Sequence, residues 1–267
     1  MWGAADFAGG SLSRRLPVLG VTLVSQAAGF LALVVAVAVR GEIGSRSFAI
    51  GLLAGVGGGV GLAAFYRALS LGTMSVVSPI AACGALVPFA LSLATGERPS
   101  RLALAGAVAA LTGAVLASVE ERRAASQSPG RARAIVLAVA AAFALGIFVY
   151  FLGLGSREGD ALSTLFGARV GSLTVLAVVA LLLRAPVRIP RSSVLAVAAV
   201  GLADVTANAL FAFASRHGLL ALVSVLGSLY PVVTVLLAHV LLEERLTRTQ
   251  RLGVALALAG VAVIAGA

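Results

Sequence analysis

Long apolar stretches and short charged segments alternate along the whole chain. Most of the apolar stretches reach the roughly 20 helical residues that cross the hydrocarbon of a bilayer. Apolar and polar positions within them do not alternate with the period of a strand, so the pattern predicts helices. The stretches are 16–39, 47–66, 68–96, 102–119, 134–156, 161–183, 192–215, 218–242 and 252–267.

The segment before the first of these stretches is shorter. Residues 2–12 are apolar apart from Asp6, and Arg14 and Arg15 follow them. Because this is less than a full span, we expect the opening helix to be truncated and the true start of the protein to lie upstream. With this helix included, the pattern predicts an all-α, polytopic membrane protein of about ten transmembrane helices.

Two halves of the chain repeat each other. Gly72 returns as Gly218 at an offset of 146 residues, and Gly106 returns as Gly253 at an offset of 147. Each copy holds several apolar stretches of membrane-spanning length. A duplicated hydrophobic unit is typical of carriers in which one site opens alternately to two sides.

The repeat also predicts the domain organisation. The most polar stretch of the chain, 120–133, lies between the two copies and has the character of a linker. We therefore expect a first five-helix repeat at 1–119 and a second at 134–267.

The composition agrees with a membrane protein. Hydrophobic residues make up 60% and charged residues 11% of the chain, and the mean hydropathy is +1.09, whereas soluble domains carry roughly 25% charged residues. The net charge of +10 comes entirely from arginine, because the chain contains no lysine. These arginines lie mainly at the ends of apolar stretches, where their heads reach phosphates and water. No folded polar face collects them, which excludes nucleic-acid binding.

The sequence gives no pattern typical of an enzyme. Residues 59–64 match G-x-G-x-x-A, but no strand precedes them and no acid between Glu42 and Glu97 is available for a ribose. Without lysine there is no Walker motif. Cys83 is the single cysteine and the two histidines are far apart, so the chain offers no internal disulfide and no metal-ligand cluster. We expect no catalysis, no cofactor and no metal.

Glycines recur at helical spacing in the second apolar stretch. Gly51, Gly55 and Gly59 lie four residues apart, and Gly57 and Gly61 repeat that spacing on a neighbouring face. Glycine lets two membrane helices approach closely. Close packing is the simpler interpretation, and the alternative is that some of these glycines line a cavity.

Short motifs occur in register in both halves. They are Trp2-Gly3 with Asp6-Phe7, Tyr66-Arg67-Ala68-Leu69, Val77-Ser78-Pro79, Gly96-Glu97-Arg98-Pro99, Leu222-Val223-Ser224, Tyr230-Pro231 and Leu242-Glu243-Glu244-Arg245. At these residues the chain resembles the EamA family of the drug/metabolite transporter superfamily, essentially over its whole length. The resemblance implies ten helices in two inverted five-helix repeats, a central cavity and export of small metabolites. It also implies cytoplasmic termini and a multi-pass location in the cytoplasmic membrane.

The orientation in the membrane has two conflicting indications. The odd-numbered connections between the expected helices hold 13 arginines and the even-numbered ones hold 6, with Arg169 left inside a helix. The positive-inside rule would place the odd connections in the cytoplasm. Cytoplasmic termini, which the resemblance implies, would place them outside.

Asp204 is the most informative single residue. It lies near the middle of the apolar stretch 192–215, where a carboxylate costs roughly 2.5–3.5 kcal/mol on insertion scales. Asn208 and Phe211 follow one and two turns later, so the three residues share a helix face. Such a face suits a cavity for an amine-bearing or otherwise polar solute, and Asp204 would also offer a site for proton coupling. The alternative is a structural carboxylate paired with Arg169.

Arg169 lies inside the stretch 161–183. At an offset of 143 it corresponds to Gln26, so both repeats place a polar group at this depth. Arg169 has three possible roles: binding a substrate carboxylate through two hydrogen bonds, neutralising Asp204, or extending to the nearer membrane surface.

Three further residues are candidates for the cavity wall. Trp2 and Asp6 lie one turn apart on the opening helix, and Tyr230 lies deep in its stretch. Pro88 and Pro231 correspond at an offset of 143 and predict a bend in each half, or merely packing kinks.

Each half also carries a Glu-Arg pair at the end of an apolar stretch, Glu97-Arg98 and Glu244-Arg245. We expect these to be local ion pairs that fix turns.

These features predict a secondary transporter that exports an amino acid or a related small metabolite by alternating access, with proton coupling as an option. The alternatives are a multidrug or aromatic-cation efflux carrier and a non-transporting membrane subunit. The expected partners are a small solute, the lipid bilayer and protons, and the protein would act as a monomer or homodimer. The expected substrate-binding residues are Asp204, Asn208, Phe211, Tyr230, Arg169, Asp6, Trp2 and Gln26.

Overall fold

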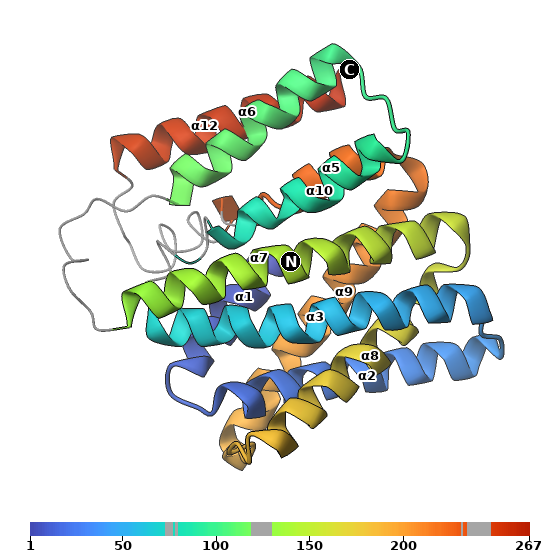
Figure 1. The fold of residues 1–267 in the computed structure, drawn as a ribbon, viewed down its shortest axis with the longest axis vertical. Coiled ribbons are helices and arrows are strands. Elements are labelled where there is room, and N and C mark those ends of the chain that lie inside the picture. Colours follow the sequence, from blue (N-terminus) through green and yellow to red (C-terminus); the bar gives the residue numbers. More distant parts are fainter. Residues whose placement is uncertain (73–76, 78–79, 119–129, 231, 234–246) are drawn as a thin grey trace.

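The chain folds into a bundle of helices (Figure 1). A computed structural model describes residues 1–72, 77, 80–118, 130–230, 232–233 and 247–267. All secondary-structure elements in these ranges are helical. The elements of the first half are α1 (Trp2–Ser13), α2 (Val18–Arg40), α3 (Ser45–Leu71), the 3-10 turn η1 (Cys83–Ala85), α5 (Leu86–Ala94) and α6 (Arg101–Ser118). Those of the second half are α7 (Arg131–Glu158), α8 (Ala161–Leu182), α9 (Arg191–His217), α10 (Leu220–Gly227) and α12 (Arg248–Ala265).

Six of the described helices are long and apolar enough to cross a membrane. They are α2, α3, α7, α8, α9 and α12, while α5 with its preceding turn and α6 are shorter apolar helices. The prediction of an all-helical, multi-pass membrane fold is therefore confirmed.

Two expected helix boundaries are wrong. The stretch 68–96 is not one helix, because α3 runs to Leu71 and a separate helical segment leads through η1 into α5. Gly72 ends α3 in an extended conformation, with φ −123° and ψ 176°. Its repeat counterpart Gly218 ends α9 in nearly the same way, with φ −136° and ψ 171°. The structure also starts α7 at Arg131, so the end of the expected linker is helical.

The two glycine stripes of α3 pack against two different helices. A Cβ built on Gly55 would lie 2.8 Å from the Cα of Gly171 in α8. On the neighbouring face, a Cβ on Gly57 would lie 2.8 Å from the carbonyl oxygen of Ala144 in α7, and one on Gly61 would lie 2.7 Å from Cγ of Leu145. The prediction of close packing is confirmed, since backbones at these distances leave no room for a larger side chain.

Helices α6 and α12 form a second close pair at one edge of the bundle (Figure 1). A Cβ on Gly106 would lie 2.9 Å from the carbonyl oxygen of Gly260, and one on Gly113 would lie 2.7 Å from that of Gly253. Gly106 and Gly113 correspond in the repeat to Gly253 and Gly260. Each glycine therefore contacts the counterpart of the other, as expected for an antiparallel pair of repeated helices.

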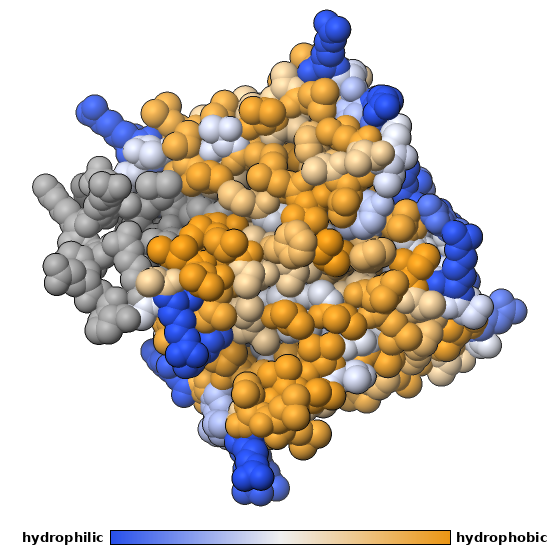
Figure 2. All heavy atoms as spheres, in the orientation of Figure 1, coloured by the Kyte–Doolittle hydropathy of each residue, from blue (hydrophilic) through white to orange (hydrophobic). Residues whose placement is uncertain are grey.

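The outside of the bundle is apolar. Figure 2 shows hydrophobic residues across the middle of one face, with hydrophilic residues at its corners and edges. Leucines such as Leu31 (64% exposed) and Leu195 (81% exposed) point outward, whereas Gln26, Arg169 and Asn208 are buried. A surface of this kind is stable in contact with lipid.

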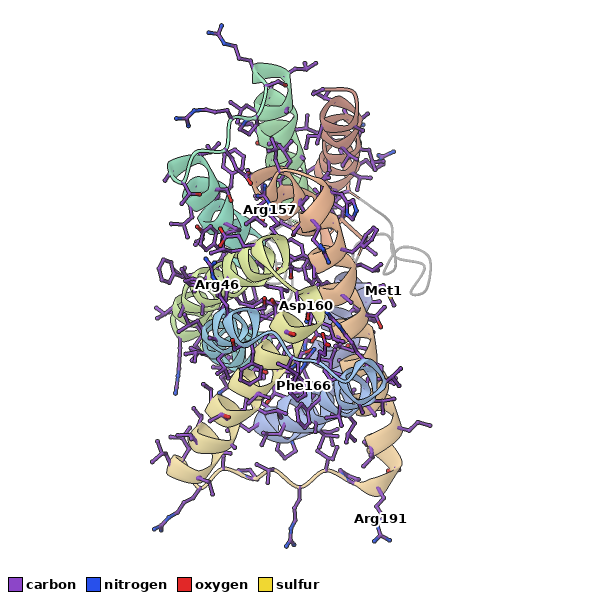
Figure 3. The ribbon with its side chains drawn as sticks, turned by 90° about the vertical axis from the view of Figure 1, so that its right-hand side faces the viewer. Met1, Arg46, Arg157, Asp160, Phe166 and Arg191 are labelled. Atoms are coloured by element: carbon purple, nitrogen blue, oxygen red, sulfur yellow. The ribbon has the colours of Figure 1, made fainter. Side chains whose placement is uncertain are left out.

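At one end of the bundle, ion pairs join helix ends and connections that are distant in sequence (Figure 3). Arg40, at the end of α2, pairs with Asp160, which precedes α8. Arg46 pairs with Glu158 at 3.2 Å between exposed side chains. These contacts fix the α2–α3 connection to the α7–α8 connection.

Glu97, between α5 and α6, does not form the local ion pair with Arg98 that we expected. Its carboxylate pairs with Arg157 of α7 and accepts hydrogen bonds from the backbone N–H groups of Leu220 and Ala221, both at 2.9 Å. Arg98 instead donates to backbone carbonyls. A carboxylate at the N-terminus of α10 satisfies two amides that have no partner within the helix, which explains why Glu97 reaches there. The matching pair, Glu244 and Arg245, lies outside the described residues.

Candidate functional site

A cavity of about 120 Å³ lies between the two halves. This is space for several water molecules or one small solute. Helices from both halves contribute to it, including α1, α2 and α3 from the first and α7, α8, α9 and α10 from the second. The polar side chains that line it are Trp2, Asp6, Gln26, Arg169, Ser172, Asp204, Asn208, Ser224, Ser228 and Tyr230.

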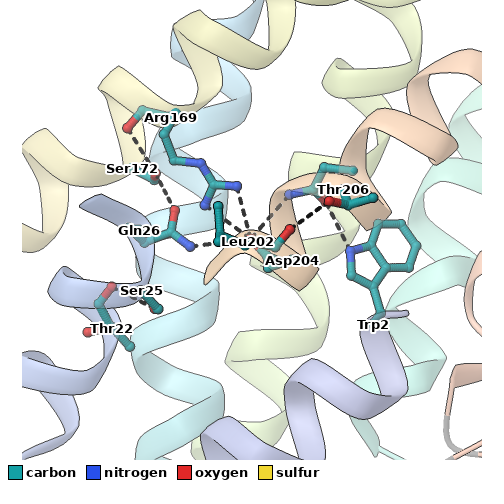
Figure 4. A network of polar contacts seen from close by, with 10 residues as sticks. Trp2, Thr22, Ser25, Gln26, Arg169, Ser172, Leu202, Asp204 and Thr206 are labelled. Atoms are coloured by element: carbon teal, nitrogen blue, oxygen red, sulfur yellow. Dashed lines mark hydrogen bonds and ion pairs between the residues drawn. The ribbon is translucent and has the colours of Figure 1, made fainter. Parts of the chain in front are cut away.

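The carboxylate of Asp204 is the centre of a hydrogen-bond network (Figure 4). Its Oδ2 accepts from Nη1 and Nη2 of Arg169, both at 3.0 Å. The same oxygen accepts from Nε2 of Gln26 at 3.4 Å and from Nδ2 of Asn208 at 3.3 Å. Oδ1 of Asp204 accepts no hydrogen bond from any residue that the structure describes. One oxygen is thus fully engaged and the other remains an acceptor.

Arg169 neutralises Asp204 and does not extend to the membrane surface. Its side chain is only 5% exposed and that of Asp204 is 23% exposed. A guanidinium and a carboxylate this far from water each need the other, because an unpaired charge in the membrane interior is costly. Of the roles considered for Arg169 from the sequence, the structure shows the pairing with Asp204.

Gln26 connects a third helix to the pair. Its Oε1 accepts a hydrogen bond from Oγ of Ser172 at 2.8 Å, while its Nε2 donates to Asp204. Gln26 of α2 and Arg169 of α8, which the sequence aligns at an offset of 143, both bind the same carboxylate. Asp204 therefore couples α2 and α8 to α9.

Trp2 continues the network into α1. Its indole Nε1 donates to Oδ1 of Asn208 at 3.0 Å, and its ring packs on Phe211 with 5.5 Å between centroids. Phe211 is buried behind Trp2 and lines a neighbouring apolar hollow instead of the central cavity. The structure thus places Phe211 one layer outside the other residues of its helix face.

Asp6 also lines the cavity. Within the described parts of the chain it makes no hydrogen bond and no ion pair. Trp2 of α1 contacts Asn208 of α9. Asp6 lies one turn after Trp2 on α1, and Asp204 lies one turn before Asn208 on α9. Gly20, near the start of α2, lies against Val187, just before α9, so α1 ends where α9 begins and the two helices are antiparallel. Because the helices are antiparallel, Asp6 and Asp204 therefore lie on the same side of the Trp2–Asn208 contact along the bundle.

The remaining candidates have different outcomes. Tyr230 lines the central cavity and also the apolar hollow beside it. Pro88 is buried in the first turn of α5, just after η1, so the regular helix is interrupted immediately before it. The bend expected at Pro231 lies outside the described residues.

Several lining residues were not anticipated from the sequence. Ser172 lies one turn after Arg169 on α8, so the spacing of the two residues could have predicted that they share the cavity face. Gly58 lines the cavity beside Phe148 of α7, where a Cβ on Gly58 would lie 2.9 Å from the phenyl ring. Nothing in the sequence separates Gly58 from the packing glycines around it.

The sequence model of the EamA-like transporter family matches residues 132–266. The chain belongs to this family. The family consists of membrane transporters, in agreement with the resemblance that the motifs gave.

The other comparisons concern the fold. No curated protein matches the sequence. Among solved structures 25 chains match, and one of them is described as "Crystal structure of protein". That structure is 20% identical to this chain, the match covers 99% of this chain and 98% of the other, and the two superpose with a TM-score of 0.76. At this identity the similarity shows a common fold.

Proposed function

We propose that this EamA-family protein is a secondary transporter that exports a small metabolite, an amino acid or a related solute, across the cytoplasmic membrane. Two inverted five-helix repeats, 1–119 and 134–267, would move against each other around the central cavity. Solute would bind at the polar residues around Asp204, and protonation of a cavity carboxylate would provide the coupling.

The observation that carries this proposal is the polar network inside an apolar bundle. Charged groups within a membrane protein are expensive and usually face a pathway for solutes or ions. Here Arg169, Asp204 and Asn208 border a cavity instead of filling the space between helices. Since Oδ1 of Asp204 and the carboxylate of Asp6 accept no hydrogen bond from the described residues, the cavity has the chemistry of a binding site.

Contacts between the halves support alternating access. Helix α3 packs on α8 and α2 packs on α9, which are exchanged pairs in the repeat. The crosswise glycine contacts of α6 and α12 follow the same rule. Reciprocal contacts of this kind are characteristic of inverted repeats, whose halves rock around a fixed site. The glycine faces of α3 would serve as the sliding surfaces.

Transport is tested by charge movement in proteoliposomes. The purified protein would be challenged with pooled amino acids across an imposed pH gradient, alongside Asp204→Asn and the matched control Glu158→Gln, which changes an exposed acid at the end of α7. We expect a saturable current that Glu158→Gln retains and Asp204→Asn loses. If no pool produces either current or radiolabel exchange, the proposal of a carrier is wrong and a non-transporting subunit becomes the better interpretation.

A further inference from the structure

We propose that the cavity selects solutes carrying a protonated amine, and that the carboxylate of Asp6 binds this amine. The inference rests on the proposed transport function and specifies its substrate class. It starts from the charges that border the cavity.

With both of its carboxyl groups ionised, the cavity has a negative formal charge. Among the described lining residues the charged side chains are Asp6, Arg169 and Asp204, so one positive and two negative charges leave a formal balance of −1. The positive charge is already engaged, because both terminal nitrogens of Arg169 donate to Asp204. The carboxyl group left for a cation is therefore that of Asp6, which has no partner among the described residues and would be ionised when a cation binds beside it.

An anionic solute fits this cavity poorly. A substrate carboxylate that bound Arg169 would have to displace Asp204, and Asp204 would then be a buried carboxylate without its cation. Asp6, in register with Asp204 along the bundle, would add repulsion. The structure thus disfavours the use of Arg169 as a carboxylate-binding residue.

A protonated amine matches the acceptors that remain. An ammonium group carries hydrogen-bond donors only, and the carboxylate of Asp6 and Oδ1 of Asp204 are acceptors without donors in the described structure. The cavity wall also holds the aromatic residues Phe65, Phe148 and Tyr230. Aromatic faces attract cations and pack against an apolar tail. The volume of about 120 Å³ gives room for a small amine.

The chain contains a built-in reporter for binding. Trp2 is the single tryptophan, it lines the cavity, and it lies one turn from Asp6. Its fluorescence, measured on the full chain in lipid nanodiscs, would be titrated with four probes of similar shape. The probes are phenethylamine (cation), phenylalanine (zwitterion), 3-phenylpropionate (anion) and 2-phenylethanol (neutral).

We expect phenethylamine to bind more tightly than the other three probes, by about tenfold or more, since one close charge pair supplies at least that difference. Asp6→Asn should remove this preference. Asp6→Glu, which keeps the charge, should restore most of it, and Glu158→Gln should leave it unchanged. Asp204→Asn should instead raise the affinity for 3-phenylpropionate, because it releases Arg169.

Three results would overturn the inference: tightest binding of the anion, binding of the amine that Asp6→Asn does not weaken, or no binding of the amine at all. In each case the proposed function is judged separately by the amino-acid current and exchange described above. If transport persists without amine selectivity, Asp6 is not the amine-binding residue, but the proposal that the protein is a carrier still holds. Thermal unfolding of each variant identifies any that fails to fold, and Asp6→Glu then decides the test.

Discussion

Both terminal nitrogens of Arg169 donate to a single oxygen of Asp204, Oδ2, at 3.0 Å. The two residues lie on different helices, α8 and α9, in the most polar part of the bundle interior. This geometry neutralises the carboxylate without covering its second oxygen. It also leaves the carboxyl group of Asp6 as the acidic group that a solute can meet in the cavity.

Removal of one member of this pair should destabilise the protein strongly. Arg169→Leu leaves a buried carboxylate without compensation, and we expect a loss of about 3–5 kcal/mol in unfolding free energy. The double variant Arg169→Leu/Asp204→Leu should recover most of this loss, because no charge remains buried. Reversible unfolding in mixed micelles measures both.

The control for this prediction is Arg46→Leu, which removes an exposed ion pair with Glu158. Exposed pairs contribute about 0–1 kcal/mol, so this variant should unfold almost as the wild type does. Equal losses in Arg169→Leu and Arg46→Leu would show that the buried pair has no special role.

Glu97 should be important for joining the halves. Glu97→Ala removes the ion pair with Arg157 and the hydrogen bonds to the amides of Leu220 and Ala221. Hydrogen bonds to a charged group contribute about 1.5–3 kcal/mol each, and we expect a loss of about 2 kcal/mol or more in the same unfolding assay. Glu158→Ala, at the end of α7, should cost less than about 1 kcal/mol. If Glu97→Ala cost no more than Glu158→Ala, the carboxylate would have no structural role at α10.

The glycine stripe of α3 should tolerate no added methyl group. A Cβ on Gly55 would meet backbone atoms of α8 at 2.8 Å, so Gly55→Ala must push the helices apart. We expect a loss of about 1–3 kcal/mol and slower transport. Gly266→Ala, at the end of α12 where the nearest atom lies at 3.5 Å, is the control and should change stability by less than about 0.5 kcal/mol. Unchanged unfolding of Gly55→Ala would contradict the close packing of α3 on α8.

Asp160 should make stability depend on pH at the acidic end. Burial alone would raise the pKa of Asp160, but hydrogen bonds from Arg40 and Ser163 outweigh it, and the pKa lies below its ordinary value. A carboxyl with a lowered pKa stabilises the fold above its unfolded pKa of about 3.9. This contribution is lost as the pH falls through the folded pKa.

The measurement is the difference in Tm between wild type and Asp160→Asn from neutral pH downward. Asparagine still caps the N-terminus of α8, so the comparison isolates the charge. The wild type should be more stable near neutral pH, and the difference should shrink in acid. A difference that stays constant in acid would show that the effect does not come from the charge of Asp160.

The sequence predicts the helices well because membrane spans have a strong local signal. The glycine spacing on α3 and the polar face of α9 could also be predicted from local sequence, because residues one turn apart share a helix face. The motifs also gave the family. Of the polar face, Asp204 and Asn208 reach the cavity, whereas Phe211 is displaced behind Trp2, and no pattern within α9 indicates this.

Contacts between distant segments were harder to predict. Glu97 was expected to pair with its neighbour Arg98, but its partners lie on α7 and at the start of α10. Local proximity favours the neighbour, while the unsatisfied amides at a helix N-terminus offer a better site that only the fold brings near. Likewise, the sequence allowed three roles for Arg169: binding a substrate carboxylate, neutralising Asp204, or extending to the membrane surface. Only the distance between Arg169 and Asp204 in the fold shows that the two residues pair.

Solute counterflow tests the central claim most directly. Proteoliposomes would be preloaded with unlabelled solute and exposed to a trace of radiolabel, an exchange that requires neither a proton gradient nor net charge movement. For wild type and Glu158→Gln we predict transient accumulation of label, and for Asp204→Asn little or none, because its released Arg169 changes the polarity of the cavity. Equal accumulation in all three would contradict a binding site at Asp204, and none in the wild type with any amino acid or amine would contradict a carrier.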